Sequence, residues 1–294
     1  MVCVFIRHTI GLGILALLIS GCQTSNDRLE NRQISGTRVL DPGTFEIGET
    51  ALKEGRYDDV QIVLQRIFEV DPNSNRGRLL VAELLLATGR AEAALNEFNK
   101  VTIEEKLKSR ILEGKGLSMV KLRRMSEGKK LLELAIAEDG SLWKCHNALG
   151  YLFDTERSWS KASIHYNKAI ELHPKTGYLY NNRGFSNILQ GKYDKAINDL
   201  NHAIRLEPKN DIAQLNLQLA LAWKGEYLEA KLGADERKKA QVLNNIGYIA
   251  LLKGEFKQAE VYFLRAIEAD AAFNKVAHLN LVYLKKLEET RQAK

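Results

Sequence analysis

Apolar and polar residues follow a helical rhythm along most of the chain, and this rhythm repeats. Three stretches show it: HNALGYLFDTERSWSKASIHYNKAIELHP from His146, YNNRGFSNILQGKYDKAINDLNHAIRLEP from Tyr180 and LNNIGYIALLKGEFKQAEVYFLRAIEADA from Leu243. In each stretch apolar residues recur every three or four positions, which places them on one face of a helix. A break near the middle divides each stretch in two. The pattern therefore predicts pairs of short amphipathic helices joined by tight turns.

Small and turn-forming residues recur in columns when the chain is read in steps of about 34 residues. Small residues allow two antiparallel helices to approach closely, and glycine ends a helix at low cost because it adopts the left-handed conformation freely. Proline closes the second helix because it cannot continue one. The columns are Gly48, Ala82, Gly116, Gly150 and Gly184 in the first helix; Gly55, Gly89, Arg123, Arg157 and Gly191 in the turn; Val60, Ala94, Gly128, Ala162 and Ala196 in the second helix; and Pro72, Pro174 and Pro208 at its end.

This set of columns resembles the tetratricopeptide repeat. The resemblance implies an all-α fold, a right-handed superhelical array of about seven helix hairpins plus a C-terminal capping helix, in residues 41–294. Each hairpin in such an array buries its apolar face only against its neighbours. The sixth repeat is short, because its second helix is cut near Leu232. Repeats are expected to start near Asp41, Asn75, Ser109, Trp143, Gly177, Asp211 and Ala240, with the cap from Lys275.

The N-terminal residues have the pattern of an export signal. Arg7 and His8 precede an apolar run from Thr9 to Ile19, which is shorter than the roughly 20 residues that a membrane-spanning helix needs. The run closes on Ile19-Ser20-Gly21-Cys22, which resembles the lipobox of bacterial lipoproteins. The resemblance implies that residues 1–21 are a signal peptide and that Cys22 carries the lipid. An ordinary cleaved signal with a coincidental cysteine is the alternative.

The residues after Cys22 bear on location and anchoring. Gln23 follows the cysteine, whereas an Asp there commonly retains Gram-negative lipoproteins in the inner membrane. The resemblance therefore implies the inner leaflet of the outer membrane, facing the periplasm. Each buried methylene of an acyl chain contributes about 0.8 kcal/mol, so several chains make a durable anchor. Residues 22–40 are polar and patternless, as expected of a flexible linker between lipid and folded domain.

Charge and cysteine content narrow the choice of partners. The net charge of +6 becomes +5 without Arg7, and basic residues alternate with acidic ones, which is typical of solvated helix faces. Export makes nucleic acid an improbable partner. Cys3 would leave with the signal and Cys22 would be lipidated, so Cys145 remains alone and cannot form an internal disulfide. We expect Cys145 to be a buried small side chain.

No catalytic or metal-binding pattern competes with the repeats. The histidines lack a zinc-binding spacing such as HExxH, and the chain contains neither a phosphate-binding loop nor a GxSxG elbow. We therefore expect no enzymatic activity, no cofactor and no metal.

Asparagine recurs in the first helices, two residues before the small column. Its amide both donates and accepts, so a row of asparagines can pair with the backbone of an extended peptide. Alternatively, these asparagines cap or bridge neighbouring helices, and the aromatic residues beside them belong to the core. The expected groove residues are Asn182, Asn216, Asn245 and Asn280, with Tyr178, Phe185, Leu219, Trp223, Tyr248 and Tyr283 beside them.

The C-terminal repeats carry a more specific resemblance. From Asn182 to Leu287, NNRGFSNILQGKYDKAINDL, a shortened repeat, LNNIGYIALLKGEFKQAEVYF and a closing NLVYL helix resemble the TadD family of the Tad (Flp) pilus assembly system. PilF-type pilotins are similar in style. This implies a protein-binding scaffold with a pilotin-like role towards a secretin. Two alternatives remain open: a periplasmic adaptor similar to the NlpI lipoproteins, docking peptidases or peptidoglycan hydrolases, and a self-associating structural lipoprotein. The sequence leaves the oligomeric state open.

Overall fold

The computed structural model describes residues 40–41, 43–232, 238–269 and 274–292. The predicted signal peptide, the lipidation site Cys22 and residues 22–39 of the predicted linker lie outside the described residues, and their assignments stay predictions.

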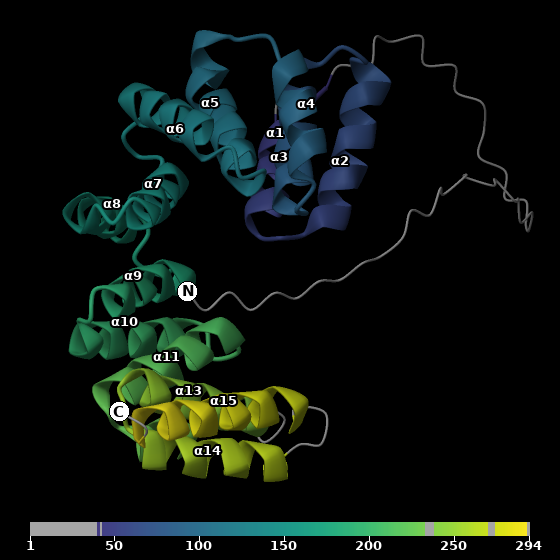
Figure 1. The fold of residues 1–294 in the computed structure, drawn as a ribbon. Helices are drawn as coiled ribbons and strands as arrows, with labels where there is room; N and C mark the ends of the chain where they lie inside the picture. Colours follow the sequence, from purple (N-terminus) through teal and green to yellow (C-terminus); the bar gives the residue numbers. More distant parts are fainter. Residues whose placement is uncertain (1–39, 42, 233–237, 270–273, 293–294) are drawn as a thin grey trace, which may run out of the picture. The chain divides into compact units, whose positions relative to one another are not determined.

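The described chain consists of helices joined by short turns, with no strand among these residues. They pair as α1/α2, α3/α4 and so on to α13/α14, and α15 follows alone (Figure 1). The predicted all-α array of helix hairpins with a C-terminal helix is thus confirmed. The helices are α1 (Gly43–Lys53), α2 (Tyr57–Val70), α3 (Asn75–Ala87), α4 (Ala91–Lys100), α5 (Glu105–Lys121), α6 (Met125–Glu138), α7 (Trp143–Thr155), α8 (Trp159–Leu172), α9 (Gly177–Leu189), α10 (Tyr193–Leu206), α11 (Asp211–Lys224), α12 (Tyr227–Leu232), α13 (Lys239–Leu252), α14 (Phe256–Ala269) and α15 (Asn274–Gln292).

Glycines in the first helices allow the hairpins to close tightly. A Cβ added at Gly150 would lie 2.7 Å from the Tyr166 ring, and one at Gly247 would lie 2.8 Å from the Phe263 ring. Such distances are far shorter than ordinary carbon contacts of about 3.5–4.0 Å. Tyr166 and Phe263 come from the second helix of the same hairpin and are buried. The small column therefore exists because a bulky side chain of the second helix fills the space beside it.

Left-handed residues end most of the first helices. Gly55, Gly89, Gly191, Gly225 and Gly254 all have φ between 72° and 99°, as the turn column predicts. Arg123 and Arg157 occupy the same column with φ of 64° and 55°. This conformation costs an L-residue with a Cβ roughly 1–2 kcal/mol, so the third and fourth hairpins carry local strain that the others avoid.

Two hairpins depart from the regular repeat. Helix α5 begins at Glu105, four residues before the expected start at Ser109, and the Asn75 side chain fixes the loop before it by bonding both the N–H and the carbonyl of Thr102. Helix α12 is only six residues long. The sixth hairpin is therefore smaller than the others, and α11 and α13 contact each other beside it.

The first helices form a continuous layer of their own. Each of α1, α3, α5, α7, α9, α11, α13 and α15 contacts the next one, whereas in the described residues no second helix contacts another second helix. Successive repeats approach each other more closely through their first helices than through their second helices. The layer of first helices therefore follows the shorter path along the array and forms its inner side. We call its exposed side the first-helix face.

Candidate functional site: the first-helix face

The N-terminal half of the first-helix face is built from ion pairs. Arg110 on α5 binds Glu83 on α3 through two hydrogen bonds of 2.8 and 3.0 Å and reaches Glu49 on α1 at 2.8 Å. Arg76 lies 2.9 Å from Glu46 and 3.2 Å from Glu49. Burial opposes the charge on Arg110, but Glu83 and Glu49 outweigh it and raise the pKa of the guanidinium. Arg76 and Arg110 are therefore neutralised by carboxylates of neighbouring first helices.

The charged half ends at the contact between α5 and α7. The thiol of Cys145 lies 3.6 Å from Oε1 of Glu113. Burial raises the pKa of Glu113 and that of Cys145, and the Glu113 carboxylate adds to the effect on the thiol. Cys145 is fully buried, as predicted, and a thiol that resists ionisation is a poor nucleophile. This cysteine is a packing residue.

Asparagine amides link the first helices of the C-terminal half. Nδ2 of Asn182 donates to Oδ1 of Asn147 at 3.0 Å, and Nδ2 of Asn216 donates to Oδ1 of Asn181 at 2.9 Å. Within α9, Asn181 also donates to Asn182 at 3.2 Å. A chain of four amides thus runs across α7, α9 and α11.

The same bond recurs nearer the C-terminus, where Asn280 on α15 donates to Asn244 on α13 at 2.8 Å. In every case the donor is an asparagine at the predicted groove position. The acceptor lies in the preceding repeat, one residue before the position that corresponds to the donor. These bonds show that Asn182, Asn216 and Asn280 bridge neighbouring helices. Each amide retains a second N–H and a second acceptor lone pair, so peptide binding by these residues stays a prediction.

The acceptors Asn147, Asn181 and Asn244 were missed by the sequence analysis. The signal was present, because asparagine is doubled at 181–182 and at 244–245. The pair at 181–182 supplies one amide to the preceding helix and one to the next, and at 244–245 Asn244 bonds the next helix.

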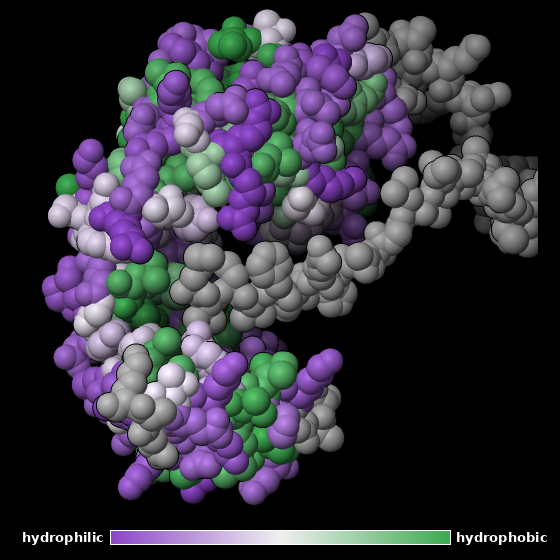
Figure 2. Space-filling view, in the orientation of Figure 1, coloured by the Kyte–Doolittle hydropathy of each residue, from purple (hydrophilic) through white to green (hydrophobic). Residues whose placement is uncertain are grey.

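The predicted apolar residues fall into two groups. Phe185 and Tyr283 expose 41% and 55% of their surface, so they are open to a partner. Tyr178, Leu219, Trp223 and Tyr248 are half-buried: the Tyr178 ring lies 5.8 Å from that of Trp143, and Trp223 stacks on Tyr193 at 6.3 Å. Figure 2 shows apolar surface over the C-terminal helices between hydrophilic residues. Further exposed apolar residues of the first helices here are Leu189, Ile212, Leu252, Val276, Leu279 and Val282.

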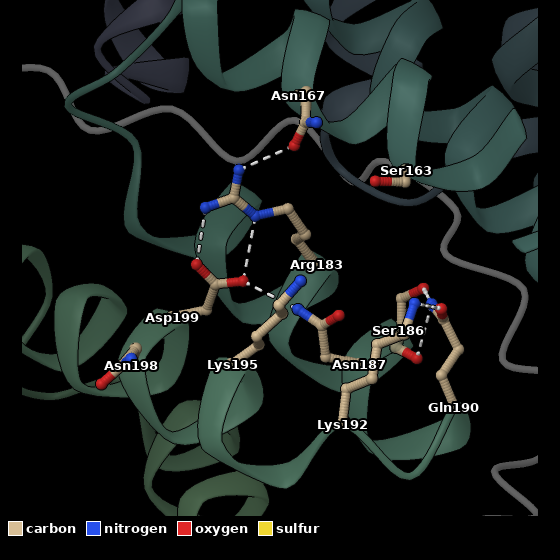
Figure 3. A pocket seen from close by; sticks show the side chains of 10 residues that line it. All are labelled: Ser163, Asn167, Arg183, Ser186, Asn187, Gln190, Lys192, Lys195, Asn198 and Asp199. Carbon is tan, nitrogen blue, oxygen red and sulfur yellow. Dashed lines mark hydrogen bonds and ion pairs between the residues drawn. The ribbon is translucent and has the colours of Figure 1, made fainter. Parts of the chain in front are cut away.

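A polar pocket of about 310 Å³ lies elsewhere, between α8, α9 and α10 (Figure 3). Arg183 binds Asp199 through bonds of 2.9 and 2.6 Å and reaches Asn167 at 2.8 Å. The guanidinium thereby ties α9 to both second helices beside it. Lys192 and Lys195 line the same pocket and give it an excess of positive charge. The arrangement is primarily a brace between hairpins.

The residues that the structure describes lack two further features. Within the residues the structure describes, no three His, Cys, Asp or Glu side chains are grouped as metal ligands would be. Across the same residues, no helix combines the length and apolarity needed to span a membrane.

Comparison with known families identifies the repeats. Tetratricopeptide-repeat models match residues 45–106, 177–210 and 240–273. Among curated proteins, none matches the sequence significantly. The matched segments identify tetratricopeptide repeats in these parts of the chain, and the helix hairpins of the described residues have the arrangement of such an array with a C-terminal helix. Repeats of this kind imply a protein-binding scaffold.

Solved structures resemble the chain in fold. A tetratricopeptide repeat protein from Parabacteroides merdae is 15% identical, with a TM-score of 0.49, over 82% of this chain and 97% of its own. A chain of the APC/C hetero-tetramer Cut9–Hcn1 is 16% identical, with a TM-score of 0.59, over 78% of this chain and 48% of its own. Human IFIT1, solved as a dimer with m7Gppp-AAAA, is 18% identical, with a TM-score of 0.59, over 85% of this chain and 64% of its own. The two structures with a TM-score of 0.59 are similar to this chain in fold, and at these identities the similarity extends to nothing more.

Proposed function

We propose that this protein is a lipid-anchored scaffold that captures a segment of a partner protein on the C-terminal half of its first-helix face. We further propose that it serves assembly of a Tad (Flp)-type pilus, with a secretin subunit as the partner. The observation that carries the proposal is the contrast between the two halves of the face. Arg76 and Arg110 of the N-terminal half pair with acidic residues of neighbouring helices, whereas most of the exposed apolar side chains of the first helices lie in the C-terminal half.

Exposed apolar side chains supply binding energy when a partner covers them. Phe185 is 41% exposed on α9, Leu252 is 53% exposed on α13, and Tyr283 is 55% exposed on α15. Burial of apolar surface contributes about 25 cal/mol per Å², and aromatic anchors in well-packed pockets dominate many interfaces. A partner segment in contact with α9, α11, α13 and α15 would cover side chains from three successive repeats and the C-terminal helix.

The finer assignment rests on the sequence. The stretch from Asn182 to Leu287 resembles the TadD family, and it coincides with the apolar half of the face. A lipid on Cys22 would hold the protein at the outer membrane, where secretin subunits assemble. The NlpI-like adaptor role would use the same surface for a peptidase or a peptidoglycan hydrolase.

Photo-crosslinking in the native host tests the proposed partner. A photoreactive amino acid replaces Phe185 in the intact lipoprotein, and trapped proteins are identified by mass spectrometry. Ile164, 65% exposed on the second helix α8, is the matched control position. We expect a secretin subunit from position 185 and not from position 164. A cell-wall hydrolase or peptidase would replace the pilus role by the adaptor role, and identical products from both positions would contradict the assigned surface.

The lipid anchor has its own test. Metabolic labelling with a fatty acid should mark the wild-type protein, and the substitution Cys22→Ala should remove the label and release the protein from the outer-membrane fraction. Label retained on Cys22→Ala would rule out this anchor.

A further inference from the structure

A gap between two second helices holds the polar pocket beside Arg183. Helices α8 and α10 do not contact each other, whereas both contact α9. Helix α9 therefore forms the floor of the gap, and the pocket of about 310 Å³ lies within it (Figure 3). Arg183, Asn187 and Gln190 line the pocket from one side of α9, and Phe185 of the first-helix face lies on another side of this helix. The pocket is thus separate from the proposed partner-binding surface.

Two polar residues of the pocket stand at positions where other repeats have core residues. Arg183 and Ser186 line the pocket from α9. The corresponding residues of α7 and α13 are apolar and at most 4% exposed; they are Leu149 and Ile246 for Arg183, and Leu152 and Ile249 for Ser186. Burying a polar group costs free energy unless the group finds a partner. The repeat fold does not require polar residues at these positions, so their presence indicates a second role for this gap.

The carboxylate of Asp199 is already occupied. It accepts hydrogen bonds of 2.6 and 2.9 Å from the guanidinium of Arg183 and one of 3.2 Å from the amide of Asn187. A carboxylate has about four acceptor sites, and these bonds use three of them. Asp199 therefore has little capacity left for a cation, and the remaining lining of the pocket is rich in donors.

Lys192 is held by a neutral group and so keeps its charge. Nε2 of Gln190 donates to the carbonyl and to the hydroxyl of Ser186 at 3.2 and 3.1 Å, and Oε1 of Gln190 accepts from Nζ of Lys192 at 2.6 Å. An amide oxygen orients an ammonium group without cancelling its charge. Lys195 lines the same space and pairs with no carboxylate of the residues described. Two ammonium groups therefore remain available to an anion.

Charge and size define the class of ligand. Among the lining residues, three cations stand against the single carboxylate of Asp199, which leaves two positive charges. A phosphate monoester carries about −1.5 to −2 at neutral pH and offers three strong acceptor oxygens, and lysine is a common phosphate ligand. All lining residues are polar or charged, so the rest of the ligand should be polar as well. A volume of about 310 Å³ lies at the lower end of the range of ligand pockets, which favours a compact molecule.

We propose that the gap between α8 and α10 binds a phosphate monoester with a small polar substituent, and that Lys192 and Lys195 contact the phosphate oxygens. Gln190 positions Lys192, and the pair of Arg183 with Asp199 fixes the floor. This site goes beyond the proposed function and does not depend on partner capture at the first-helix face. A free molecule and a lipid headgroup can present the same phosphate, and the test separates these two sources.

The test is calorimetric titration of the full-length protein, in uncharged detergent micelles at neutral pH, with glycerol 3-phosphate. We expect one site per chain. The combined substitution Lys192→Gln/Lys195→Gln should lower the affinity at least about tenfold, because it removes two charge-assisted contacts. Lys209, exposed just beyond the far end of α10, is the matched control, and Lys209→Gln should leave the affinity unchanged. Acetate, with one charge, should bind more weakly than glycerol 3-phosphate.

Phosphatidic acid added to the micelles identifies the source of the phosphate, with phosphatidylcholine as its control. Displacement of glycerol 3-phosphate by phosphatidic acid alone would assign the site to a lipid headgroup, and displacement by neither lipid would assign it to a free molecule. Lys192 and Lys195 are both exposed, so the double variant should keep its helical content and thermal stability. Absence of glycerol 3-phosphate binding, equal affinity in the double variant and Lys209→Gln, or equally strong binding of acetate would overturn the proposal.

Discussion

Asn216 donates a hydrogen bond of 2.9 Å to Asn181, 35 positions earlier in the chain, and each side chain is 7% exposed. This bond joins α11 to α9 across a repeat boundary. A buried amide that loses its partner costs about 1–3 kcal/mol. The pair is therefore part of what fixes one repeat on the next.

Asn216→Ala should lower the free energy of unfolding by about 1–3 kcal/mol. Because repeat arrays open locally, hydrogen exchange of α9 and α11 is the suitable measurement. Exchange should accelerate in these helices and remain unchanged in α3. The exposed Asn198 on α10 provides a control, whose replacement by Ala should change stability by less than about 0.5 kcal/mol. If both substitutions lowered the free energy of unfolding equally, the bond between Asn216 and Asn181 would contribute no more to stability than an exposed side chain does.

Arg157→Gly should stabilise the protein. Arg157 is exposed and has a φ of 55°, a conformation that costs an L-residue roughly 1–2 kcal/mol. Glycine avoids this cost but gives up about 0.5–1 kcal/mol through its freer unfolded chain, so we expect a net gain of up to about 1 kcal/mol in urea unfolding. Arg123 is less suitable for this test, because its guanidinium also donates a hydrogen bond to the Tyr151 hydroxyl, which glycine would remove. A loss of stability in Arg157→Gly would mean that the arginine makes a stabilising contact outweighing its strain.

Acidification should destabilise the fourth hairpin. Nδ1 of His146 on α7 lies 3.1 Å from Nδ1 of His165 on α8. Burial lowers the pKa of both rings, and that of His165 falls to about 4, with His146 and Lys129 adding to the effect. Lys168 also disfavours protonation of His146, whereas the nearby Gly140 carbonyl and Glu171 favour it.

The sign of the effect follows from linkage. The unfolded chain binds protons on histidine below about pH 6.5, while in the folded protein both pKa values are lower and that of His165 is about 4. The contribution of the two neutral histidines to the free energy of unfolding is therefore fully present above pH 6.5 and is lost as the pH falls towards 4. Thermal unfolding followed from pH 7.5 to pH 4.5 should show this loss, and His165→Phe, which preserves a ring against Phe153, should reduce it. A profile that is unchanged by His165→Phe would exclude the pair as its source.

The hairpins could be predicted because their determinants are local and periodic. Gly150 and Tyr166 meet within one hairpin, and the turn glycines act through their own backbone, so both recur visibly in the sequence. The early start of α5 could not be read from the repeat phase, because it depends on Asn75 holding a loop one repeat away.

The chemistry of the first-helix face was only partly predictable. The asparagine column indicated the right face, but pairing between Asn216 and Asn181 depends on how two helices from different repeats are rotated against each other. The ion pairs of Arg110 with Glu49 and Glu83 draw on three repeats, so no single repeat contains their pattern. The division of the face into a charge-paired half and an apolar half became visible only when these side chains were placed together.

The most direct test of partner capture on the first-helix face is the affinity of the full-length protein for a purified secretin subunit, compared between two substitutions that each insert a charge. Leu252→Glu places a carboxylate on the apolar half of the first-helix face, whereas Leu264→Glu places one on the second helix α14, where the leucine is 44% exposed. Circular dichroism first establishes equal helical content. We expect Leu252→Glu to abolish binding and Leu264→Glu to preserve it. Wild-type affinity in Leu252→Glu would contradict the claim that this surface captures the partner.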